Sequence, residues 1–176
     1  MNHSMRRALI DQAALSANVE ALRNAAPARH TLVVVKANGY GHGAVTAAHA
    51  ALAGGADWLG VADVTEALEL RTAGISAPIL AWLHSAREDF VAAVDAGVTI
   101  GVSTTDQLDA LAQCDLPSVH LKVDSGLGRN GIGRAERSGF FEKAAQLHHA
   151  GTIRIDGVMS HLAGTSRASD LSQAEE

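Results

Sequence analysis

The chain has 176 residues, of which 47% are hydrophobic and 19% charged, which suits one folded domain and excludes a disordered chain of high net charge. Its net charge of −5, without any cluster of Lys and Arg, argues against a nucleic-acid-binding protein. The single cysteine, Cys114, excludes an intramolecular disulfide, and no apolar run reaches the roughly 18 residues that a membrane span needs. We therefore expect a cytoplasmic protein whose core is aliphatic, because aromatic residues make up only 3%.

Extended and helical segments alternate along the chain. A helix is expected over residues 11–25, with Asp11 as its N-cap. Six short apolar runs follow it, and their length and lack of regular polar alternation are typical of strands buried on both faces. These runs are residues 32–35, 58–62, 78–83, 99–102, 119–123 and 155–159.

Segments with helical spacing lie between the apolar runs, and most of them end at a glycine suited to a left-handed C-cap. Ser85 with Glu88, and Thr104 with Gln107, have the spacing of a capping box at a helix start. The expected helices are residues 44–52, 65–72, 85–96, a helix after Thr104, and 134–150.

This alternation predicts a parallel sheet with helical crossovers. Two architectures fit the pattern: an open doubly wound sheet, and a barrel, which needs eight strands and typically about 250 residues. The last segment, with Ser169 and Asp170 as cap candidates, resembles the start of a helix and has almost no apolar face. We therefore interpret the chain as truncated after about six strands.

Reactive side chains in parallel α/β folds gather at the carboxyl ends of the strands. The residues in such positions are Lys36, Asn38, Tyr40, His42, Asp63, His84, Ser103, Thr104, Lys122, Asp124, Arg129 and His161. The histidines raise the alternative of a metal-dependent hydrolase with a carbamylated bridging lysine. Because no closely spaced pair of ligands follows a strand, no metal site is predicted.

The segment 33–43, VVVKANGYGHG, is the sharpest of these features. Lys36 directly follows a buried strand, where an ammonium group is costly to desolvate. A neutral amine in that place can attack an aldehyde and form a Schiff base. Gly39, Gly41 and Gly43 allow the backbone to bend tightly around a bound group. A solvated lysine before a glycine turn is the alternative for a lone lysine.

Several segments closely resemble the alanine racemase family. Residues 36–43, KANGYGHG, resemble its pyridoxal-lysine motif KANAYGHG, with Gly39 in place of an alanine. Residues 60–80 resemble its second βα unit and third strand, residues 120–131, HLKVDSGLGRNG, its segment HLKxDTGMGRxG, and residues 157–163, GVMSHLA, its sixth strand. Several such matches in family order over essentially the whole chain are not expected by chance.

The resemblance implies an α/β fold, a (β/α)8 TIM-type barrel of the alanine racemase N-terminal domain type, truncated to about six strands. Residues 1–176 would form the N-terminal part of the pyridoxal-phosphate-binding barrel, and the family's C-terminal β domain would be absent. The implied activity is the pyridoxal-phosphate-dependent interconversion of L-alanine and D-alanine, which supplies D-alanine for peptidoglycan. Full-length members are homodimers that bind a small amino acid, so neither a nucleic-acid nor a membrane partner is implied.

The resemblance also implies roles for individual residues. Lys36 would carry pyridoxal 5′-phosphate as a Schiff base and act as one of two acid–base groups. Tyr40 would hydrogen-bond the cofactor phosphate, and Arg129 would contact the cofactor's phenolic oxygen and the substrate carboxylate. His161 would lie against the cofactor ring, with a structural histidine as its alternative.

Lys122 has two interpretations. In some members of the family the lysine that matches it is carbamylated and orients the arginine that matches Arg129. The alternative is a plain ion pair between Lys122 and Asp124, and the sequence leaves both open.

The resemblance further implies that this chain alone has little racemase activity. The family's second base is a tyrosine of the C-terminal domain, supplied by the partner subunit, whereas Tyr40 is the only tyrosine here. Two other functions stay open: a non-catalytic pyridoxal-phosphate-binding barrel protein, and a racemase for another amino acid.

Overall fold

The computed structural model describes residues 7–26, 28–85 and 87–175, and within them six parallel strands form one sheet in the order β1-β2-β3-β4-β5-β6. The strands are β1 (Leu32–Val34), β2 (Trp58–Val61), β3 (Ile79–Ala81), β4 (Val98–Val102), β5 (Ser118–Lys122) and β6 (Arg154–Met159). Each strand lies beside its predecessor, so the sheet lacks the reversal of strand order that defines a doubly wound fold. The architecture is the barrel type, and the doubly wound alternative is wrong.

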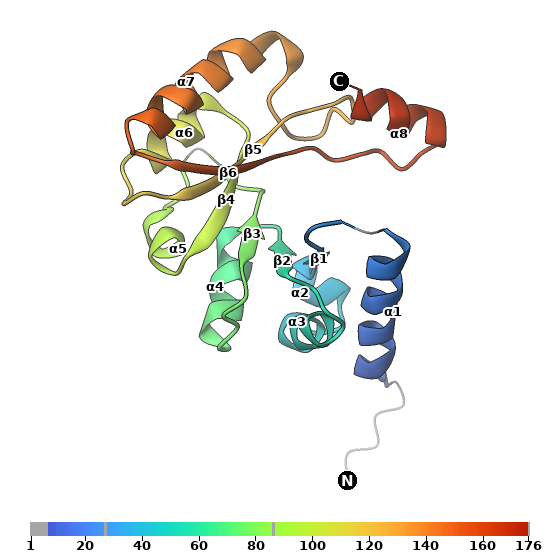
Figure 1. Ribbon diagram of the computed structural model, residues 1–176. Helices are drawn as coiled ribbons and strands as arrows, with labels where there is room; N and C mark the ends of the chain where they lie inside the picture. Colours follow the sequence, from blue (N-terminus) through green and yellow to red (C-terminus); the bar gives the residue numbers. More distant parts are fainter. Residues whose placement is uncertain (1–6, 27, 86, 176) are drawn as a thin grey trace.

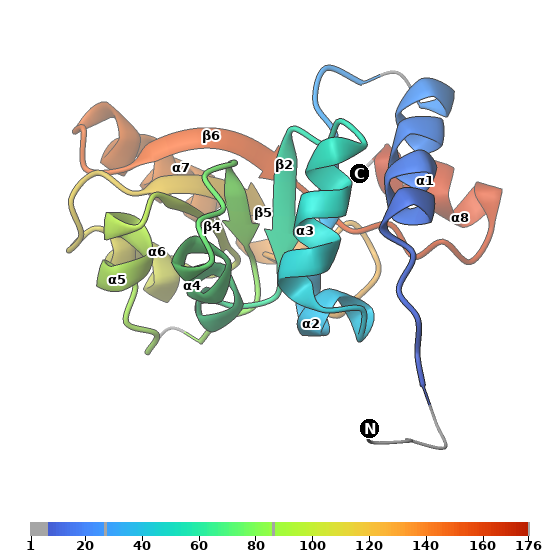
Figure 2. The same cartoon turned by 90° about the horizontal axis from the view of Figure 1, so that it is seen from below.

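Helices α4 to α7 follow one side of the curved sheet, α1 lies beside α3, and α8 extends beyond β6 (Figures 1 and 2). The helices are α1 (Gln12–Ala25), α2 (Lys36–Tyr40), α3 (Ala44–Ala53), α4 (Val64–Thr72), α5 (Val91–Asp95), α6 (Thr105–Leu111), the 3-10 turn η1 (Arg134–Glu136), α7 (Arg137–His149) and α8 (Arg167–Ala174). None of the helices in the described ranges is long and apolar enough to cross a membrane.

Two of the predicted helix starts are confirmed by their caps. Asp11 Oδ1 accepts a hydrogen bond from Ala14 N at 3.0 Å at the start of α1. Thr104 Oγ1 accepts one from Gln107 N at 3.2 Å at the start of α6. A side-chain oxygen at the N-cap satisfies one of the backbone N–H groups that the first helical turn leaves unpaired.

The helix predicted over residues 85–96 is wrong in its first half, since only α5 (Val91–Asp95) is helical there. Ser85 Oγ accepts a hydrogen bond from the backbone N–H two residues later, at 3.2 Å. Asp89 Oδ1 does the same for the first residue of α5, at 3.1 Å. Such local bonds compete with helix formation and favour turns. Ala86, inside the predicted capping box, lies outside the described residues.

The last helix, α8, begins earlier than the sequence indicated. Its N-cap is Ser166, whose Oγ accepts a hydrogen bond from Ser169 N at 3.1 Å. Ser169 and Asp170 therefore lie in the first turn instead of capping the helix. Asp170 Oδ1 accepts a hydrogen bond from Gly164 N at 2.9 Å, which folds the preceding loop back onto the helix.

The core is aliphatic, as the composition predicts. Leu59, Ile79 and Ile100 of the sheet are fully buried, and Leu70 and Phe140 pack against the sheet from the helices. All five positions of β4 are buried, whereas every second position of β6 is exposed. The expectation of strands buried on both faces is thus confirmed for β4 and wrong for β6, because side chains at alternate positions of β6 share a face, and that face is exposed.

Helix α1 approaches α3 closely at Gly54. A Cβ atom on Gly54 would lie 2.4 Å from the carbonyl oxygen of Ser16 and 2.9 Å from Cβ of Val19. Ser16 Oγ also donates a hydrogen bond to Ala50 O at 2.8 Å, which ties the two helices together. Because Gly54 has an ordinary φ of −78°, its requirement for glycine is steric.

Gly54→Ala is expected to lower the free energy of unfolding by about 1–3 kcal/mol, because the added methyl group forces the two helices apart. Gly139→Ala in α7 is the matched control, since a Cβ there has no atom within 4 Å. This control should raise the free energy of unfolding by about 0.5–1 kcal/mol, because alanine loses less entropy in a helix. Urea denaturation measures both values, and equal stability of the two variants would contradict the close approach.

Candidate functional site

A cavity of about 490 Å³ lies at the carboxyl ends of the strands, a size within the ~300–1,000 Å³ typical of small-molecule sites. All five site residues expected from the sequence line it: Lys36, Tyr40, Lys122, Arg129 and His161. Its other walls are Leu32, Val34, Leu80, Trp82, Leu83, His120, Val158 and Met159. The cavity therefore combines mostly apolar walls with amine, guanidinium, phenol and imidazole groups.

Lys36 follows β1 and opens a left-handed turn. Ala37, Asn38 and Gly39 have φ values of +52°, +54° and +63°, and Tyr40 has +52°. The sequence predicted that the backbone bends at the glycines. It did not predict left-handed backbone at Ala37, Asn38 and Tyr40, whose Cβ atoms make that conformation costly. The turn brings Lys36 Nζ to 4.7 Å from the centre of the Tyr40 ring.

Side chains near the turn hold it through backbone bonds. Asn38 Oδ1 accepts a hydrogen bond from Ala44 N at 2.8 Å. His42 Nδ1 lies 2.8 Å from Gly39 O. Asn38 and His42 were candidates because they follow a strand, and the structure shows both stabilising the turn, outside the group that lines the cavity.

Lys122 is 4% exposed, and its Nζ donates a hydrogen bond to Asn130 O at 2.5 Å. Burial lowers the pKa of Lys122, the charge of Arg129 lowers it further, and Asp124 opposes the shift. The surroundings therefore make the ammonium form of Lys122 less favourable than it is in water. The sequence left open an ion pair between Lys122 and Asp124. Among the described residues this pair is not formed, because Lys122 Nζ donates to Asn130 O and Asp124 accepts from Gly126 N.

Asp124 organises the loop that carries Arg129. Its Oδ1 accepts hydrogen bonds from Gly126 N at 2.9 Å and Gly128 N at 3.0 Å. The bond from Gly128, and then that from Gly126, lower the pKa of Asp124. Gly131 closes the loop with a φ of +133°, and a Cβ there would lie 2.5 Å from Asp124 N. Arg129 is thus presented from a tightly folded loop.

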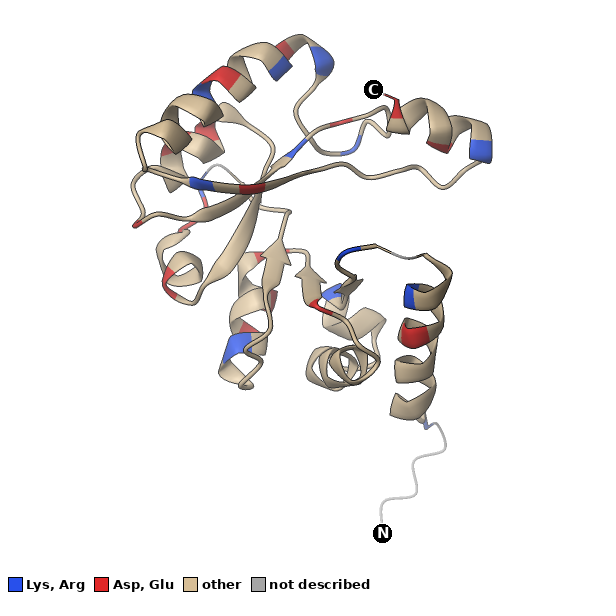
Figure 3. Cartoon of the chain, viewed as in Figure 1, with Lys and Arg blue, Asp and Glu red and all other residues tan. Residues whose placement is uncertain are grey.

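Positive charge concentrates around the cavity. Burial lowers the pKa of His161, and the charges of Arg129, Lys122 and Lys36 lower it further. Elsewhere along the ribbon, acidic and basic residues both occur (Figure 3). A neutral imidazole beside several cationic groups suits a ligand with phosphate or carboxylate oxygens.

The strand-end histidines do not converge. His84 Nε2 donates to Gly101 O at 2.9 Å, and its ring packs edge-on against Phe90. Only His161 of the three lines the cavity. Within the ranges that the structure describes, no group of three or more His, Cys, Asp or Glu side chains is placed to hold a metal ion. The geometry gives no support to a metal-dependent hydrolase.

His120 also lines the cavity, although the sequence did not indicate it as a candidate. Its ring lies 5.8 Å from that of Trp58, and Gly157 opposite it leaves the space that the ring occupies. The spacing could have predicted this, because His120 lies two residues before Lys122 on one strand and its side chain therefore lies on the same face of the sheet. Asp63, by contrast, followed a strand but serves as the N-cap of α4.

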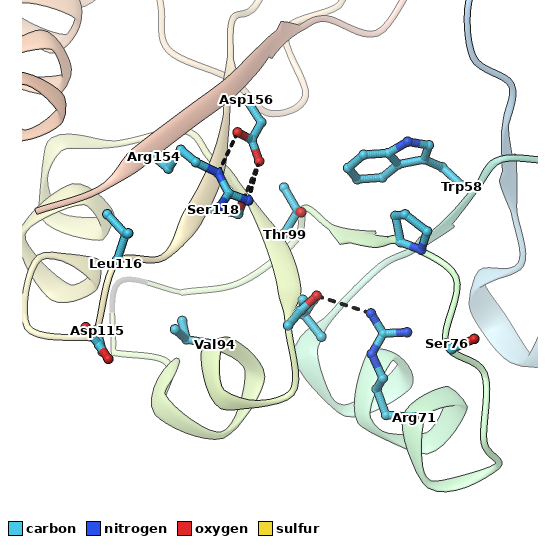
Figure 4. A pocket seen from close by; sticks show the side chains of 13 residues that line it. Trp58, Arg71, Ser76, Val94, Thr99, Asp115, Leu116, Ser118, Arg154 and Asp156 are labelled. Atoms are coloured by element: carbon cyan, nitrogen blue, oxygen red, sulfur yellow. Dashed lines mark hydrogen bonds and ion pairs between the residues drawn. The ribbon is translucent and has the colours of Figure 1, made fainter. Parts of the chain in front are cut away.

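A second cavity, of about 440 Å³, lies at the amino ends of the strands (Figure 4). Arg154 Nε donates to Asp156 Oδ1 at 2.8 Å, and Ser118 Oγ donates to the same carboxylate. Arg71 donates to backbone carbonyl oxygens, among them that of Ala77 at 2.7 Å. These polar groups already have partners, and the amino ends of barrel strands usually serve stability. The candidate site is therefore the cavity at the carboxyl ends.

Residues 10–175 match the model of the alanine racemase N-terminal domain. The chain belongs to this family. The alanine racemase of Thermobifida fusca is 47% identical over 165 residues, covering 91% of this chain and 44% of the relative. That of Mycolicibacterium smegmatis is 43% identical over 159 residues, covering 88% and 41%.

Solved alanine racemases have the same fold. The enzyme from the D-cycloserine-producing Streptomyces lavendulae has a TM-score of 0.90 at 38% identity, covering 94% of this chain and 46% of that one. The enzyme from Bacillus anthracis, solved with bound L-Ala-P, has a TM-score of 0.82 at 33% identity, covering 94% and 45%. The chain therefore spans less than half the length of these relatives.

Arg129→Gln in this racemase domain is expected to raise the pKa of His161, because it removes the largest of the charges that disfavour the imidazolium. An NMR titration of the imidazole protons measures the shift. Arg23→Gln on α1, a charge that does not act on His161, should leave the titration unchanged. Identical His161 titrations in the two variants would contradict the grouping of these side chains.

Proposed function

We propose that this chain is the cofactor-binding part of an alanine racemase, which interconverts L-alanine and D-alanine with pyridoxal 5′-phosphate. The proposal rests on one observation: the amine of Lys36, the phenol of Tyr40, the guanidinium of Arg129 and the imidazole of His161 line the same cavity. The family membership supports the reaction, because the relatives of Thermobifida fusca and Mycolicibacterium smegmatis are alanine racemases.

The residues of the cavity suit pyridoxal 5′-phosphate. Lys36 offers a half-buried amine, which can condense with an aldehyde when it is neutral. Leu80 and Trp82 offer apolar surface for an aromatic ring, and the nearby cations suit a phosphate group. When bound, the cofactor supplies an electron sink that stabilises negative charge at the substrate α-carbon.

The proposed roles follow from these positions. Lys36 holds the cofactor and exchanges a proton, at Nζ, with one face of the α-carbon. Tyr40 donates a hydrogen bond to the phosphate. Arg129 binds the substrate carboxylate and the phenolic oxygen of the cofactor. His161 lies against the cofactor ring, and burial and the charge of Arg129 lower its pKa, which favours the neutral imidazole.

Lys122 is proposed to be carbamylated. Its side chain is buried and burial lowers its pKa, which raises the share of the neutral amine, the form that adds carbon dioxide. A bond forms between Nζ and the carbon, and one proton leaves the nitrogen. The remaining N–H can still donate to Asn130 O, and the new carboxylate gives Arg129 an anionic neighbour.

Racemisation needs a proton donor or acceptor on each face of the α-carbon. Lys36 serves one face, and Tyr40, the only tyrosine of the chain, is assigned to the phosphate. We therefore propose that the residues of this chain do not supply the second base, and that the homodimer is a property of full-length members of the family. The cytoplasmic location and the absence of nucleic-acid and membrane partners remain predictions from the sequence.

Incubating the purified chain with pyridoxal 5′-phosphate and reducing it with borohydride should label Lys36, because its amine faces the cavity. Peptide mapping by mass spectrometry identifies the modified lysine. Lys36→Ala should lose the label, whereas Lys143→Ala, which removes a lysine paired with Asp109 away from the site, should keep it. A label spread over several lysines, or none on Lys36, would sink the cofactor assignment.

The loaded chain should exchange the α-hydrogen of only one enantiomer of alanine with deuterated solvent, because Lys36 serves one face. Racemisation itself should be close to the background rate. Proton NMR follows the exchange, and chiral chromatography follows the racemisation. Robust racemisation would show that this chain already holds a second base. Cofactor attachment without exchange of either enantiomer would favour the non-catalytic binding protein.

A further inference from the structure

Glu66, in the first turn of α4, joins two backbone segments beside the site. Its Oε1 accepts a hydrogen bond from Ala37 N at 2.6 Å, and its Oε2 accepts one from Ala62 N at 2.7 Å. Ala37 follows Lys36 directly, and Ala62 follows β2. A single carboxylate therefore links the carboxyl ends of β1 and β2 next to the lysine that lines the cavity.

The link falls where the backbone is least favourable. Ala37 has a φ of +52°, and the left-handed conformation continues through Asn38. Residues with a Cβ persist in this region only where the surroundings over-determine it. The bond to Ala37 N fixes the peptide group between Lys36 and Ala37. That peptide group sets the direction in which the Lys36 side chain leaves the strand.

A second capping residue shows why a carboxylate is needed here. Gln107 occupies the same place in α6, three residues after the N-cap Thr104, as Glu66 does after Asp63 in α4. Gln107 Oε1 accepts from Ser103 N, and its Nε2 donates to His84 O, both at 2.7 Å. An amide matches one donor and one acceptor, whereas the two N–H donors at Glu66 require two acceptor oxygens.

We infer that Glu66 is a positioning residue that holds the left-handed turn after β1 and so aims Lys36 into the cavity. This inference rests on the proposed role of Lys36 as the cofactor lysine. It assigns Glu66 a function beyond capping α4, because the oxygen that accepts from Ala37 N contributes nothing to that helix.

The test compares Glu66→Gln with Gln107→Glu. Both substitutions keep the size of the side chain. Glu66→Gln replaces an acceptor oxygen by an NH2 donor, and Gln107→Glu replaces an NH2 donor by an acceptor oxygen, so each removes one hydrogen bond at the equivalent position of its helix. The full 176-residue chain is titrated with pyridoxal 5′-phosphate, attachment at Lys36 is followed by absorbance, and the label is mapped after borohydride reduction.

Glu66→Gln is expected to weaken attachment at Lys36 by about tenfold, the effect of losing a hydrogen bond to a charged group. Gln107→Glu should bind the cofactor as the unmodified chain does, although unfolding measurements should show it to be at least as destabilised, because Gln107 is 4% exposed and the new carboxylate faces a carbonyl oxygen. Equal attachment in the two variants would overturn the inference and leave Glu66 as a helix cap only.

A measurement without cofactor separates this inference from the proposed function. Amide hydrogen exchange of residues 36–43 should rise up to about tenfold in Glu66→Gln and stay unchanged in Gln107→Glu, because only in the first do Ala37 N and Ala62 N share a single acceptor oxygen. Unchanged exchange in both would overturn the role of Glu66 whatever the cofactor does. A failure of the unmodified chain to label Lys36, with exchange as expected, would count against the proposed function alone.

Loss of folding in Glu66→Gln would not end the test. Gly139→Ala, expected to stabilise α7 in a place remote from the cavity, provides a background in which both variants are repeated. In that background the same difference in attachment and exchange is expected, and its absence would overturn the inference.

Discussion

The parallel pairing of consecutive strands is the constraint on which the rest of this structure depends. Each strand pairs with the next in the chain, so all six carboxyl ends face one edge of the sheet. Residues that are far apart in the sequence, such as Lys36 and His161, thereby line one cavity. The helical crossovers lie on the outer side and bury the aliphatic core, which leaves this edge free for polar side chains.

Strand pairing brings the residues close, but short-range backbone devices aim them. After β1 the chain enters a left-handed turn, which is stabilised by hydrogen bonds near the turn and by the carboxylate of Glu66 from α4. After β5 the carboxylate of Asp124 gathers the N–H groups of a glycine-rich loop, and Gly131 lets the chain return against the strand end. Both devices place a cationic side chain at the cavity, Lys36 in the first and Arg129 in the second.

The electrostatics of the site follow from this crowding of cations. Burial lowers the pKa of Lys122, and burial and the nearby charges lower the pKa of His161. A neutral amine is chemically different from an ammonium, since it has a lone pair for carbon electrophiles. The fold thus shifts the pKa values of Lys122 and His161 by placing charged side chains together, and the sequence of each segment alone does not reveal this.

The sequence by itself determined the class of fold and the residues of the site. Apolar runs of strand length, separated by helical segments with caps, determined the βα alternation, because burial and capping are local properties of the chain. The motif around Lys36 and the segment around Arg129 identified the cavity residues through their resemblance to the family. The strand and helix pattern alone left barrel and doubly wound sheet open, the family resemblance implied the barrel, and the strand order of the tertiary structure confirmed it, because that order depends on pairing between distant segments. The tertiary structure also decided which strand-end residues face the cavity: His120 does, whereas Asp63 caps α4. The bond from Ala37 N to Glu66 was found only in the structure, since contacts between distant segments leave no local signal in the sequence.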